Sequence, residues 1–326
     1  MTTDEVNISV IIPVYNSGEF ITDAIESILN QKPLDTVSAL PTLEIIVVDD
    51  LSTDTKTLEI LEHYKNHLFA TVRVIKNSRL KGVAGARNSG VYAAKGQWIA
   101  FLDSDDIWFP YSLALRWEAI EKNQEIRWLA AKFNILRATV SIETEKAKSF
   151  LSTKELFKNL ANPKTRVLPR RIHNTFECFS KECFTGIMTV LVHRSLILEK
   201  GLFDENLRRA EDYHLWLKCA IDQDLYFLDI ETAFYRIHSA SLTHGDAPKY
   251  QNEDVMIDRL LAEGVSDINK SLLLKRLDLV MQDHCYFYRE KGDFSSGMTY
   301  ALRWLKSRPT RFNPWKEILA CTLRIT

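Results

Sequence analysis

Residues 98–106 read WIAFLDSDD, a short apolar run that ends abruptly in three carboxylates. Continuous apolar runs of this kind are typical of strands that are buried on both faces, as in a parallel sheet. Two other stretches have the same form, ISVIIPVYN at 8–16 and LEIIVVDD at 43–50, where polar residues again follow the apolar run. We therefore predict buried strands at 8–14, 43–48 and 98–102.

Helical patterns alternate with these strands. Apolar residues recur at helical spacing after residue 20, and further helices are predicted at 55–66 and 86–95, with a strand at 72–75 between them. This alternation predicts an open α/β sheet. Ligands bind at the carboxyl ends of the strands in such sheets. We therefore expect the polar groups that follow the three apolar runs to face one crevice.

The rest of the chain has weaker signals. Residues 138–180 are mixed in charge and weakly periodic, and we interpret them as an insertion or flexible loop. A strand at 190–192 and a helix at 211–221 resume the α/β pattern. From about residue 247 the patterns are helical only. The predicted division is an α/β domain at 1–245 and a helical C-terminal subdomain at 246–326.

Composition excludes several classes of protein. The 326 residues include 42 Lys+Arg and 43 Asp+Glu, so there is no basic excess of the kind a nucleic-acid binder shows. We expect no signal peptide, because the first residues lack a basic start and an apolar core. No apolar run approaches the roughly 20 residues of a membrane-spanning helix. The five cysteines form no C-x-x-C pair, which indicates reduced thiols in a cytosolic protein and no structural zinc site.

The carboxylates of Asp103, Asp105 and Asp106 lie within four residues and repel one another. A divalent cation bound through oxygen ligands would supply the missing counter-charge. Helix capping is the structural alternative, because Asp106 lies shortly before Pro110, a residue favoured in a first helical turn. The position of the cluster after a buried strand, at the predicted crevice, favours the metal site.

Six segments in order along residues 6–245 resemble the family 2 inverting glycosyltransferases, of the non-processive type that builds bacterial surface glycans. The segments are ISVIIPVYN (8–16), EIIVVDDLSTD (44–54), GVAGARNSG (82–90), WIAFLDSDD (98–106), RRAEDYHLWLK (208–218) and YRIHSASLT (235–243). The resemblance implies a GT-A fold, a Rossmann-like open mixed sheet flanked by helices. Its nucleotide-sugar half would span about 1–110 and its acceptor half about 111–245.

The resemblance also implies a nucleotide-sugar donor site at the strand ends. Tyr15 offers a ring for stacking on the base, Asp50 would accept a uracil N–H, and Arg87, near a helix start, would contact phosphate or base. The structural alternatives are a core tyrosine for Tyr15, a turn aspartate for Asp50 and a surface ion pair for Arg87. Leu51 stands where the family often has glycine. The expected donor-binding residues are Pro13, Tyr15, Asn16, Asp50, Arg87, Asp103 and Ser104.

A divalent metal, Mn²⁺ or Mg²⁺, is implied at the same edge. Asp105 is the preferred direct ligand, Asp103 would serve both ribose and metal, and Asp106 is the alternative to Asp105. His238 resembles a histidine that completes the metal site in many relatives, although a structural histidine is as well supported. The metal would stabilise the leaving diphosphate as a Lewis acid.

Glu211 and Asp212 open a predicted helix, where acidic side chains also stabilise the helix without any catalytic role. By resemblance, this pair is catalytic: Asp212 is the general base that removes the proton of the acceptor hydroxyl. Trp216 would stack on an acceptor sugar or belong to the core. Thr185 and Gly186 fall where relatives approach the acceptor.

The sequence contains two further patterns that resemble functional motifs. Gln124-Glu-Ile-Arg127-Trp128 matches the Q-x-x-R-W motif of processive relatives, but it precedes Asp212 by more than eighty residues and is attributed to chance. Basic and aromatic residues gather near the C-terminal end and suit an anionic membrane surface, or else an ordinary basic helix packed on the domain. They are Arg303, Trp304, Lys306, Arg308, Arg311, Phe312, Trp315, Lys316 and Arg324.

The expected function is therefore metal-dependent, inverting transfer of one hexosyl or N-acetylhexosaminyl group. The donor would be a nucleotide-sugar, namely a UDP-sugar, and the acceptor a hydroxyl of a growing surface glycan or lipid-linked oligosaccharide. We expect the protein in the cytoplasm or on the inner face of the plasma membrane, with no nucleic-acid partner. A non-catalytic glycan- or partner-binding module is the alternative. A nucleotidyltransferase is disfavoured because its glycine-rich, basic phosphate loop is missing near the N-terminus.

Overall fold

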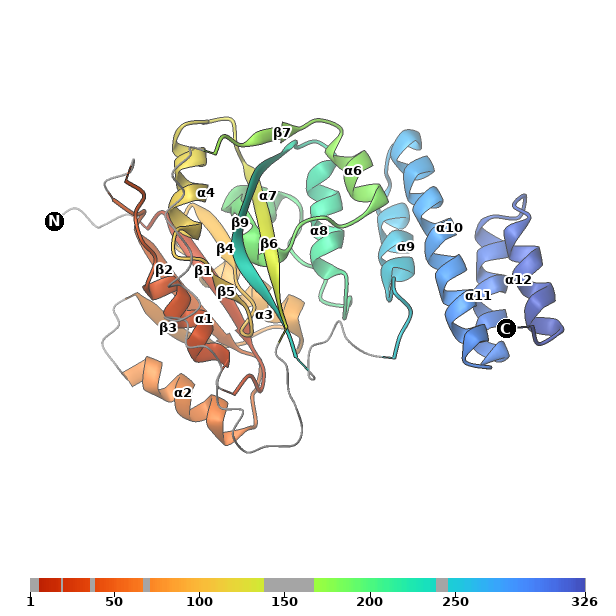
Figure 1. The fold of residues 1–326 in the computed structure, drawn as a ribbon, viewed down its shortest axis with the longest axis horizontal. Helices are drawn as coiled ribbons and strands as arrows, with labels where there is room; N and C mark the ends of the chain where they lie inside the picture. Colours follow the sequence, from red (N-terminus) through yellow and green to blue (C-terminus); the bar gives the residue numbers. More distant parts are fainter. Residues whose placement is uncertain are drawn as a thin grey trace. The chain divides into compact units, whose positions relative to one another are not determined.

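A computed structural model describes residues 6–18, 20–35, 39–66, 71–137, 167–238 and 246–325 of the chain. The chain divides into two compact units (Figure 1). The first contains residues 1–175, 184–205 and 219–244, and the second contains residues 176–183, 206–218 and 245–326. The second unit is thus assembled from three stretches of chain, and one of them carries Asp212.

One mixed sheet forms the centre of the first unit, with the strand order β3-β2-β1-β4-β8-β6-β9-β5 and with β7 paired to β9. The first three strands and β4 run parallel, whereas β8 is antiparallel to both β4 and β6. The open α/β sheet predicted from the sequence is confirmed. The strands are β1 Ile8–Val14, β2 Leu43–Asp49, β3 Val72–Lys76, β4 Trp98–Phe101, β5 Ile107–Trp108, β6 Trp128–Arg137, β7 Arg170–Ile172, β8 Leu191–His193 and β9 Leu225–Ile237.

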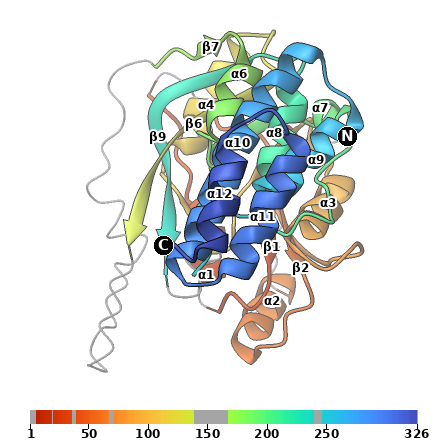
Figure 2. The same ribbon diagram turned by 90° about the vertical axis from the view of Figure 1, so that its right-hand side faces the viewer.

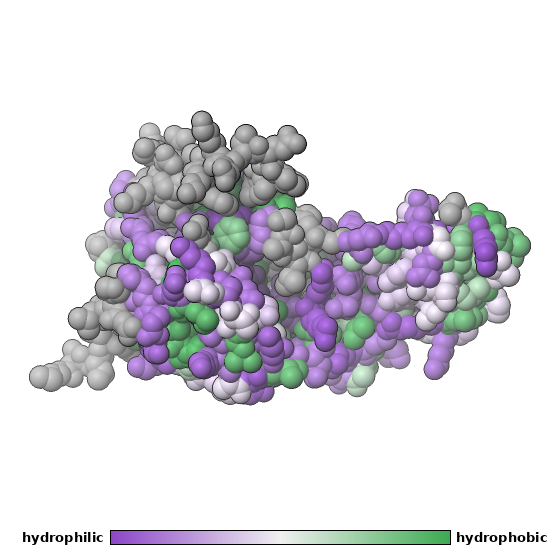
Figure 3. Space-filling model, turned by 90° about the horizontal axis from the view of Figure 1, so that it is seen from below, coloured by the Kyte–Doolittle hydropathy of each residue, from purple (hydrophilic) through white to green (hydrophobic). Residues whose placement is uncertain are grey.

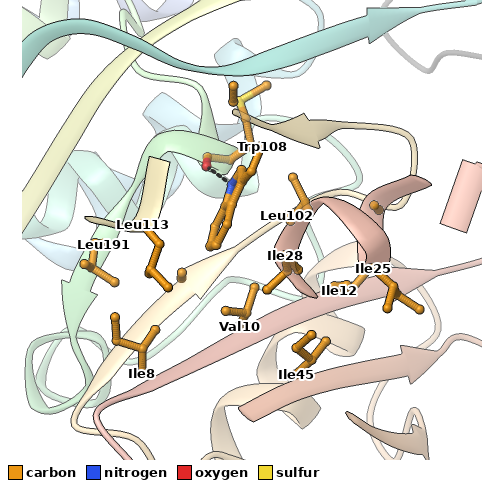
Figure 4. Close-up of a cluster of buried hydrophobic side chains, with 14 of the residues drawn as sticks. Ile8, Val10, Ile12, Ile25, Ile28, Ile45, Leu102, Trp108, Leu113 and Leu191 are labelled. Carbon is orange, nitrogen blue, oxygen red and sulfur yellow. Dashed lines mark hydrogen bonds between the residues drawn. The ribbon is translucent and has the colours of Figure 1, made fainter. Parts of the chain in front are cut away.

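Helices cover both faces of the parallel part of this sheet. Side chains alternate along a strand, so Val10 and Ile12 of β1 point to the face where they pack with the apolar residues of α1 (Figure 4). Ile11 points to the other face, where it touches Gly90 of α3. The helices of this unit are α1 Phe20–Leu29, α2 Thr55–Asn66, α3 Val83–Ala93, α4 Ser112–Glu121 and α7 Arg194–Glu199.

Strands β6 and β9 are the part of the sheet that the sequence patterns did not reveal. They pair in parallel over most of their length, with register shifts around Lys132. Charged and amide residues interrupt both strands, so neither forms a continuous apolar run. Strand β9 matters for the site because it ends at Ile237, directly before His238. Of the predicted insertion at 138–180, residues 138–166 lie outside the described part of the chain, and the remainder includes β7.

The second unit is helical, as predicted for the C-terminal region. Its helices are α9 Glu253–Glu263, α10 Asp267–Glu290, α11 Phe294–Ser307 and α12 Asn313–Thr322, together with most of α6 Thr175–Lys181 and α8 Glu211–Ala220. Helices α10, α11 and α12 pack side by side (Figure 2). Trp304 is fully buried among them, and its indole N–H donates to Asp278 Oδ1 at 2.8 Å. Within the described residues, no helix is long and apolar enough to span a bilayer.

Candidate active site

The carboxyl ends of β1, β2 and β4 meet at one edge of the sheet. The Asp50 N–H, directly after β2, donates to the Val14 carbonyl at the end of β1, at 2.7 Å. The hydroxyls of Ser17 and Ser104 lie 2.6 Å apart and join the loop after β1 to the loop after β4. The convergence expected from the order of the strands is therefore seen in the geometry of these loops.

Asp50 is buried at this edge, and we call the two groups that donate hydrogen bonds to it, Asn77 Nδ2 and the Gly82 N–H, the Asp50 seat. The Asp50 side chain is 5% exposed, and both of its oxygens accept hydrogen bonds. Asn77 Nδ2 donates to Oδ1 at 2.6 Å, and the Gly82 N–H donates to Oδ2 at 2.8 Å. Sequence reasoning missed Asn77, although it follows β3 as the other polar residues follow β1, β2 and β4. That same signal could have found it.

The loop before α3 supplies the Gly82 N–H of the Asp50 seat, and glycines allow its tight backbone path. Gly82 adopts a φ of 137°, which side chains disfavour, and Gly85 lies so close to the loop that a Cβ atom would be 1.9 Å from the Leu80 carbonyl oxygen. Lys81 extends from this loop with its ammonium 4.3 Å from the centre of the Tyr15 ring. Lys81 was also missed, and no pattern in the sequence indicated it.

The residues that follow β1 have distinct environments. Tyr15 is 49% exposed, so its ring is available at the surface, whereas Pro13 is buried within β1 opposite Val48. Asn16, at a φ of 49°, accepts hydrogen bonds at Oδ1 from the N–H groups of residues 53 and 54 and so joins the β1 and β2 loops. Leu51 has a φ of 67°, a conformation that glycine adopts more easily. Leucine at position 51 therefore holds a backbone conformation that would be less strained with the glycine often found in the family.

Arg87 and Asp103 form an ion pair that is buried on the arginine side. Arg87 is 3% exposed, and its Nη2 lies 2.6 Å from Asp103 Oδ1. The guanidinium also lies 5.5 Å from the centre of the Phe203 ring. This arginine is therefore in an ion pair, as the structural alternative assumed, but its guanidinium is buried and not at the surface. The pair ties α3 to the loop after β4.

Asp105, in the loop after β4, and His238, directly after β9, lie side by side. His238 Nε2 lies 3.0 Å from Asp105 Oδ2, and the imidazole stacks on Phe20 with ring centres 4.6 Å apart. Burial and the negative charge of Asp103 raise the pKa of Asp105, while the hydrogen bond from His238 opposes this change. A cation at this point would offset the repulsion between the two carboxylates.

Asp106 has a structural position. It is fully buried, and its Oδ1 accepts the Arg236 N–H at 3.0 Å. Arg236 in turn donates from Nη2 to Asp23 at 2.8 Å. Burial, followed by the charges of Asp105 and Asp103, raises the pKa of Asp106 well above its usual range. Of the two alternatives for the direct metal ligand, this geometry favours Asp105.

The residues at this edge fit a divalent cation as a partial ligand set. Carboxylate oxygens suit Mn²⁺ or Mg²⁺, whereas an imidazole nitrogen is more typical of zinc, copper, iron and nickel sites. Among the described residues, no group of three His, Cys, Asp or Glu side chains is arranged to hold a metal. If a metal binds here, Asp105 and His238 would be two of its ligands, and their side chains already lie 3.0 Å apart. Mg²⁺ is commonly bound by one or two carboxylates together with substrate phosphates, which is the arrangement this pair allows.

The predicted catalytic pair lies at the first turn of α8, in the second unit. Glu211 is 7% exposed, and Asp212 Oδ1 accepts the N–H of Tyr213 at 2.7 Å. The Tyr213 hydroxyl donates to the Phe179 carbonyl, which fixes the start of the helix to α6. Trp216 is fully buried, which favours the core alternative over stacking on a sugar.

Thr185 and Gly186 precede a short 3-10 turn, Ile187–Thr189. Thr185 is 5% exposed, and a Cβ atom on Gly186 would lie 3.0 Å from the Phe133 ring. Trp108 Nε1 donates to the Met188 carbonyl at 2.7 Å and holds this turn (Figure 4). A side chain at this position would make the Met188 and Phe133 side chains shift, and an acceptor role for the two residues stays a prediction.

The Q-x-x-R-W match has a structural explanation. Arg127 Nη2 donates to Glu199 Oε1 at 2.7 Å, and Trp128 is fully buried at the start of β6. Both side chains therefore serve the packing of α7 and the sheet.

Comparison with known proteins identifies the fold and the family of this chain. The crystal structure of S. aureus TarS 1-349 in complex with UDP-GlcNAc matches with a TM-score of 0.58 at 20% identity, covering 97% of this chain and 79% of that chain. The fold is therefore that of the GT-A glycosyltransferases. A sequence model described as Glycosyl transferase family 2 matches residues 9–166.

Two relatives support the family assignment. WfgD of Escherichia coli, a UDP-Glc:alpha-D-GlcNAc-diphosphoundecaprenol beta-1,3-glucosyltransferase, is 28% identical over 242 residues, which are 74% of this chain and 81% of WfgD. The uncharacterized glycosyltransferase MJ1057 of Methanocaldococcus jannaschii is 31% identical over 238 residues, 72% of each chain. The chain belongs to glycosyl transferase family 2 and is a glycosyltransferase.

Proposed function

We propose that this glycosyltransferase moves one sugar from a UDP-sugar to a hydroxyl of a growing surface glycan, with inversion at the anomeric carbon and with a divalent metal. The observation that carries the proposal is the arrangement at one sheet edge. There Asp50 lies in its seat after β2, and Asp103 and Asp105 lie after β4, with His238 beside Asp105.

The Asp50 seat supports recognition of a uracil base. An ionised carboxylate has about four lone-pair sites, and Asn77 and Gly82 occupy two of them. Asp50 can therefore accept the uracil N3–H without losing either partner. Tyr15, half exposed at the next strand end, offers its ring to the base. WfgD is named for a UDP-Glc donor, which agrees with this choice.

Asp105 and His238 would hold the metal, with Asp103 shared between the metal and Arg87. When bound, Mn²⁺ or Mg²⁺ supplies Lewis-acid stabilisation of the diphosphate leaving group. Arg87 adds a fixed positive charge behind Asp103 and restrains that carboxylate. Asp103 is thus oriented before the donor binds.

Asp212 acts as the general base in this proposal, with Glu211 beside it. A carboxylate that removes the acceptor proton while the oxygen attacks the anomeric carbon contributes on the order of 10²–10⁴-fold in rate. One displacement from the face opposite the diphosphate inverts the configuration. The acceptor is a surface glycan or lipid-linked oligosaccharide, as the name of WfgD suggests. Such an acceptor places the enzyme at the cytoplasmic face of the plasma membrane.

The test is UDP release from a panel of UDP-sugars with Mn²⁺, using wild type, Asp105→Ala and Asp212→Asn. We expect slow hydrolysis of one donor, lost in Asp105→Ala, and transfer to acceptor lost in Asp212→Asn. Asp267→Asn is the matched control, because Asp267 also lies in the first turn of a helix, α10. That control should keep full activity.

Other outcomes identify the alternatives. Failure of wild type to bind or hydrolyse UDP-, GDP- or dTDP-sugars would support a non-catalytic binding module. Release of pyrophosphate in place of UDP would indicate a nucleotidyltransferase. Full transfer by Asp212→Asn would contradict the assigned base.

A further inference from the structure

One face of helix α12 and of the residues that flank it carries large apolar side chains that are exposed. Phe312 is 76% exposed, Trp315 54%, Leu319 58% and Leu323 59%. These positions recur at the spacing of one helix face. The opposite face is buried and includes the charged residue Glu317. Figure 3 shows hydrophobic side chains gathered on the surface of the C-terminal helices, at the right of the view.

A buried ion pair fixes this orientation. Glu317 Oε2 lies 2.9 Å from Arg289 Nε, and both side chains are almost fully buried. Arg289 Nη1 also donates to the Ile325 carbonyl at 2.8 Å, directly after the helix. Rotation of α12 to bury Trp315 and Leu319 would separate this pair and leave a buried arginine without its carboxylate, which is costly. The apolar face therefore points outward as a consequence of the fold.

The chain segment that carries this apolar face is basic. Between residues 306 and 325 the only acidic side chain is Glu317, which is buried. Lys316 and Arg324 are exposed beside the apolar residues, and no carboxylate among the described residues lies within 4 Å of either. Arg311, also exposed, approaches only Asp278, at 3.7 Å. Lys316 and Arg324 therefore add positive charge beside the apolar residues.

We propose that this face docks onto an anionic lipid surface. The α12 face is defined as Phe312, Trp315, Leu319 and Leu323 with the flanking Lys316 and Arg324. A helix with aromatic and leucine side chains on one side and basic residues beside them lies in the plane of a membrane interface. Basic side chains beside an anionic bilayer strengthen such contact. The inference deepens the proposed function, because a lipid-linked acceptor would be met at that surface.

A second copy of the chain is a weaker candidate for the occupant. A helix of 10 residues is about 15 Å long. One face of such a helix offers much less than the roughly 800 Å² that each partner buries in a stable interface. Repulsion between two copies of the same basic border would oppose self-association further.

Co-sedimentation with vesicles tests the proposal. We expect the full chain to bind vesicles of phosphatidylglycerol and phosphatidylcholine, to bind pure phosphatidylcholine weakly, and to be released by salt. Trp315→Ser combined with Leu319→Ser should weaken binding by about tenfold or more. The control is Ile268→Ser with Leu279→Ser on α10, which removes two equally exposed apolar side chains outside the α12 face. That control should bind as wild type does.

Charge reversal gives an independent variant. Lys316→Glu with Arg324→Glu should weaken binding to anionic vesicles by roughly 25-fold or more, since each basic residue contributes about fivefold. Lys270→Glu with Lys275→Glu on α10 makes the same change in net charge and should have a much smaller effect. Circular dichroism of all variants would show that each is folded.

The result that overturns the proposal is vesicle binding that is absent in wild type or equal in all variants. Concentration-dependent dimerisation, lost in Trp315→Ser/Leu319→Ser and unaccompanied by lipid binding, would also overturn it and assign the face to a second copy. Hydrolysis of a UDP-sugar without vesicles should be unchanged in every α12 variant. Lipid binding by a protein that hydrolyses no donor would keep this inference and contradict the proposed function, so the two failures are distinguishable.

Discussion

Replacing Gly85 with alanine should weaken UDP binding, because it displaces the loop that holds Asp50. A Cβ atom at this position would lie 1.9 Å from the Leu80 carbonyl oxygen, whereas ordinary contact begins at 3.4 Å. The difference, 3.4 minus 1.9, requires the Leu80 backbone to move by about 1.5 Å. The obstacle is backbone, which cannot change rotamer to escape.

The movement is large enough to break the seat of Asp50. The Gly82 N–H, two residues after Leu80, donates to Asp50 Oδ2 at 2.8 Å. Hydrogen bonds of this type tolerate a range of only about 0.5 Å. A hydrogen bond to a charged group contributes about 1.5–3 kcal/mol. If UDP must restore this position of Asp50 on binding, its affinity falls by about tenfold or more.

Gly90→Ala is the matched control. Gly90 lies on the same helix, α3, and its Cβ atom would be 2.4 Å from Ile11 Cγ2, a side chain in the core. Both substitutions overpack α3 and should lower the free energy of unfolding by about 1–3 kcal/mol. Only Gly85→Ala should change the affinity for UDP.

Isothermal titration calorimetry with UDP, together with urea unfolding of both variants, measures the two effects separately. The reasoning is refuted if Gly85→Ala binds UDP as tightly as Gly90→Ala while both proteins lose similar stability. That result would mean that the seat of Asp50 makes no contribution to nucleotide binding.

Three further tests by substitution address other contacts. Asn77→Ala should lower UDP affinity about tenfold by removing the 2.6 Å hydrogen bond to Asp50, as calorimetry would show. Because burial raises the pKa of Asp106, the free energy of unfolding should fall as the pH rises above 3.8, the ordinary pKa. Asp106→Asn should remove most of that fall and gain about 1–3 kcal/mol at pH 8 in urea unfolding. Arg276 Nε lies 2.8 Å from Glu253 Oε2, and both side chains are largely buried. Arg276→Met should lower the free energy of unfolding by about 3–5 kcal/mol by leaving Glu253 without this partner, and adding Glu253→Gln should recover part of that loss.

Local patterns were sufficient for the first half of the fold. Strand β1 and helix α2 have the predicted bounds, because a doubly buried strand and an amphipathic helix each impose a simple period on the chain. Strands β6 and β9 escaped prediction because polar residues on their partly exposed faces break that period. Helix α12 was not distinguished within the basic C-terminal segment.

The candidate site also contains residues that the sequence predicted and residues that it did not. Asp50, Asp103 and Asp105 were identified because polar residues after parallel strands must share one edge of a sheet. Their partners were not all visible: Asn77 was overlooked, and Lys81 left no pattern. The catalytic role of Asp212 and the acceptor roles of Thr185 and Gly186 stay predictions.

By itself, the sequence determined the family, the sheet and the sheet edge at which we propose the donor site, since these follow from short-range patterns and from the order of motifs. Only the tertiary structure decided which neighbouring carboxylate faces His238 and which is buried against Arg236. It also decided that α12 buries Glu317 and exposes Trp315. The physical reason is that these outcomes depend on contacts between residues far apart in the chain, such as the ion pair of Glu317 with Arg289.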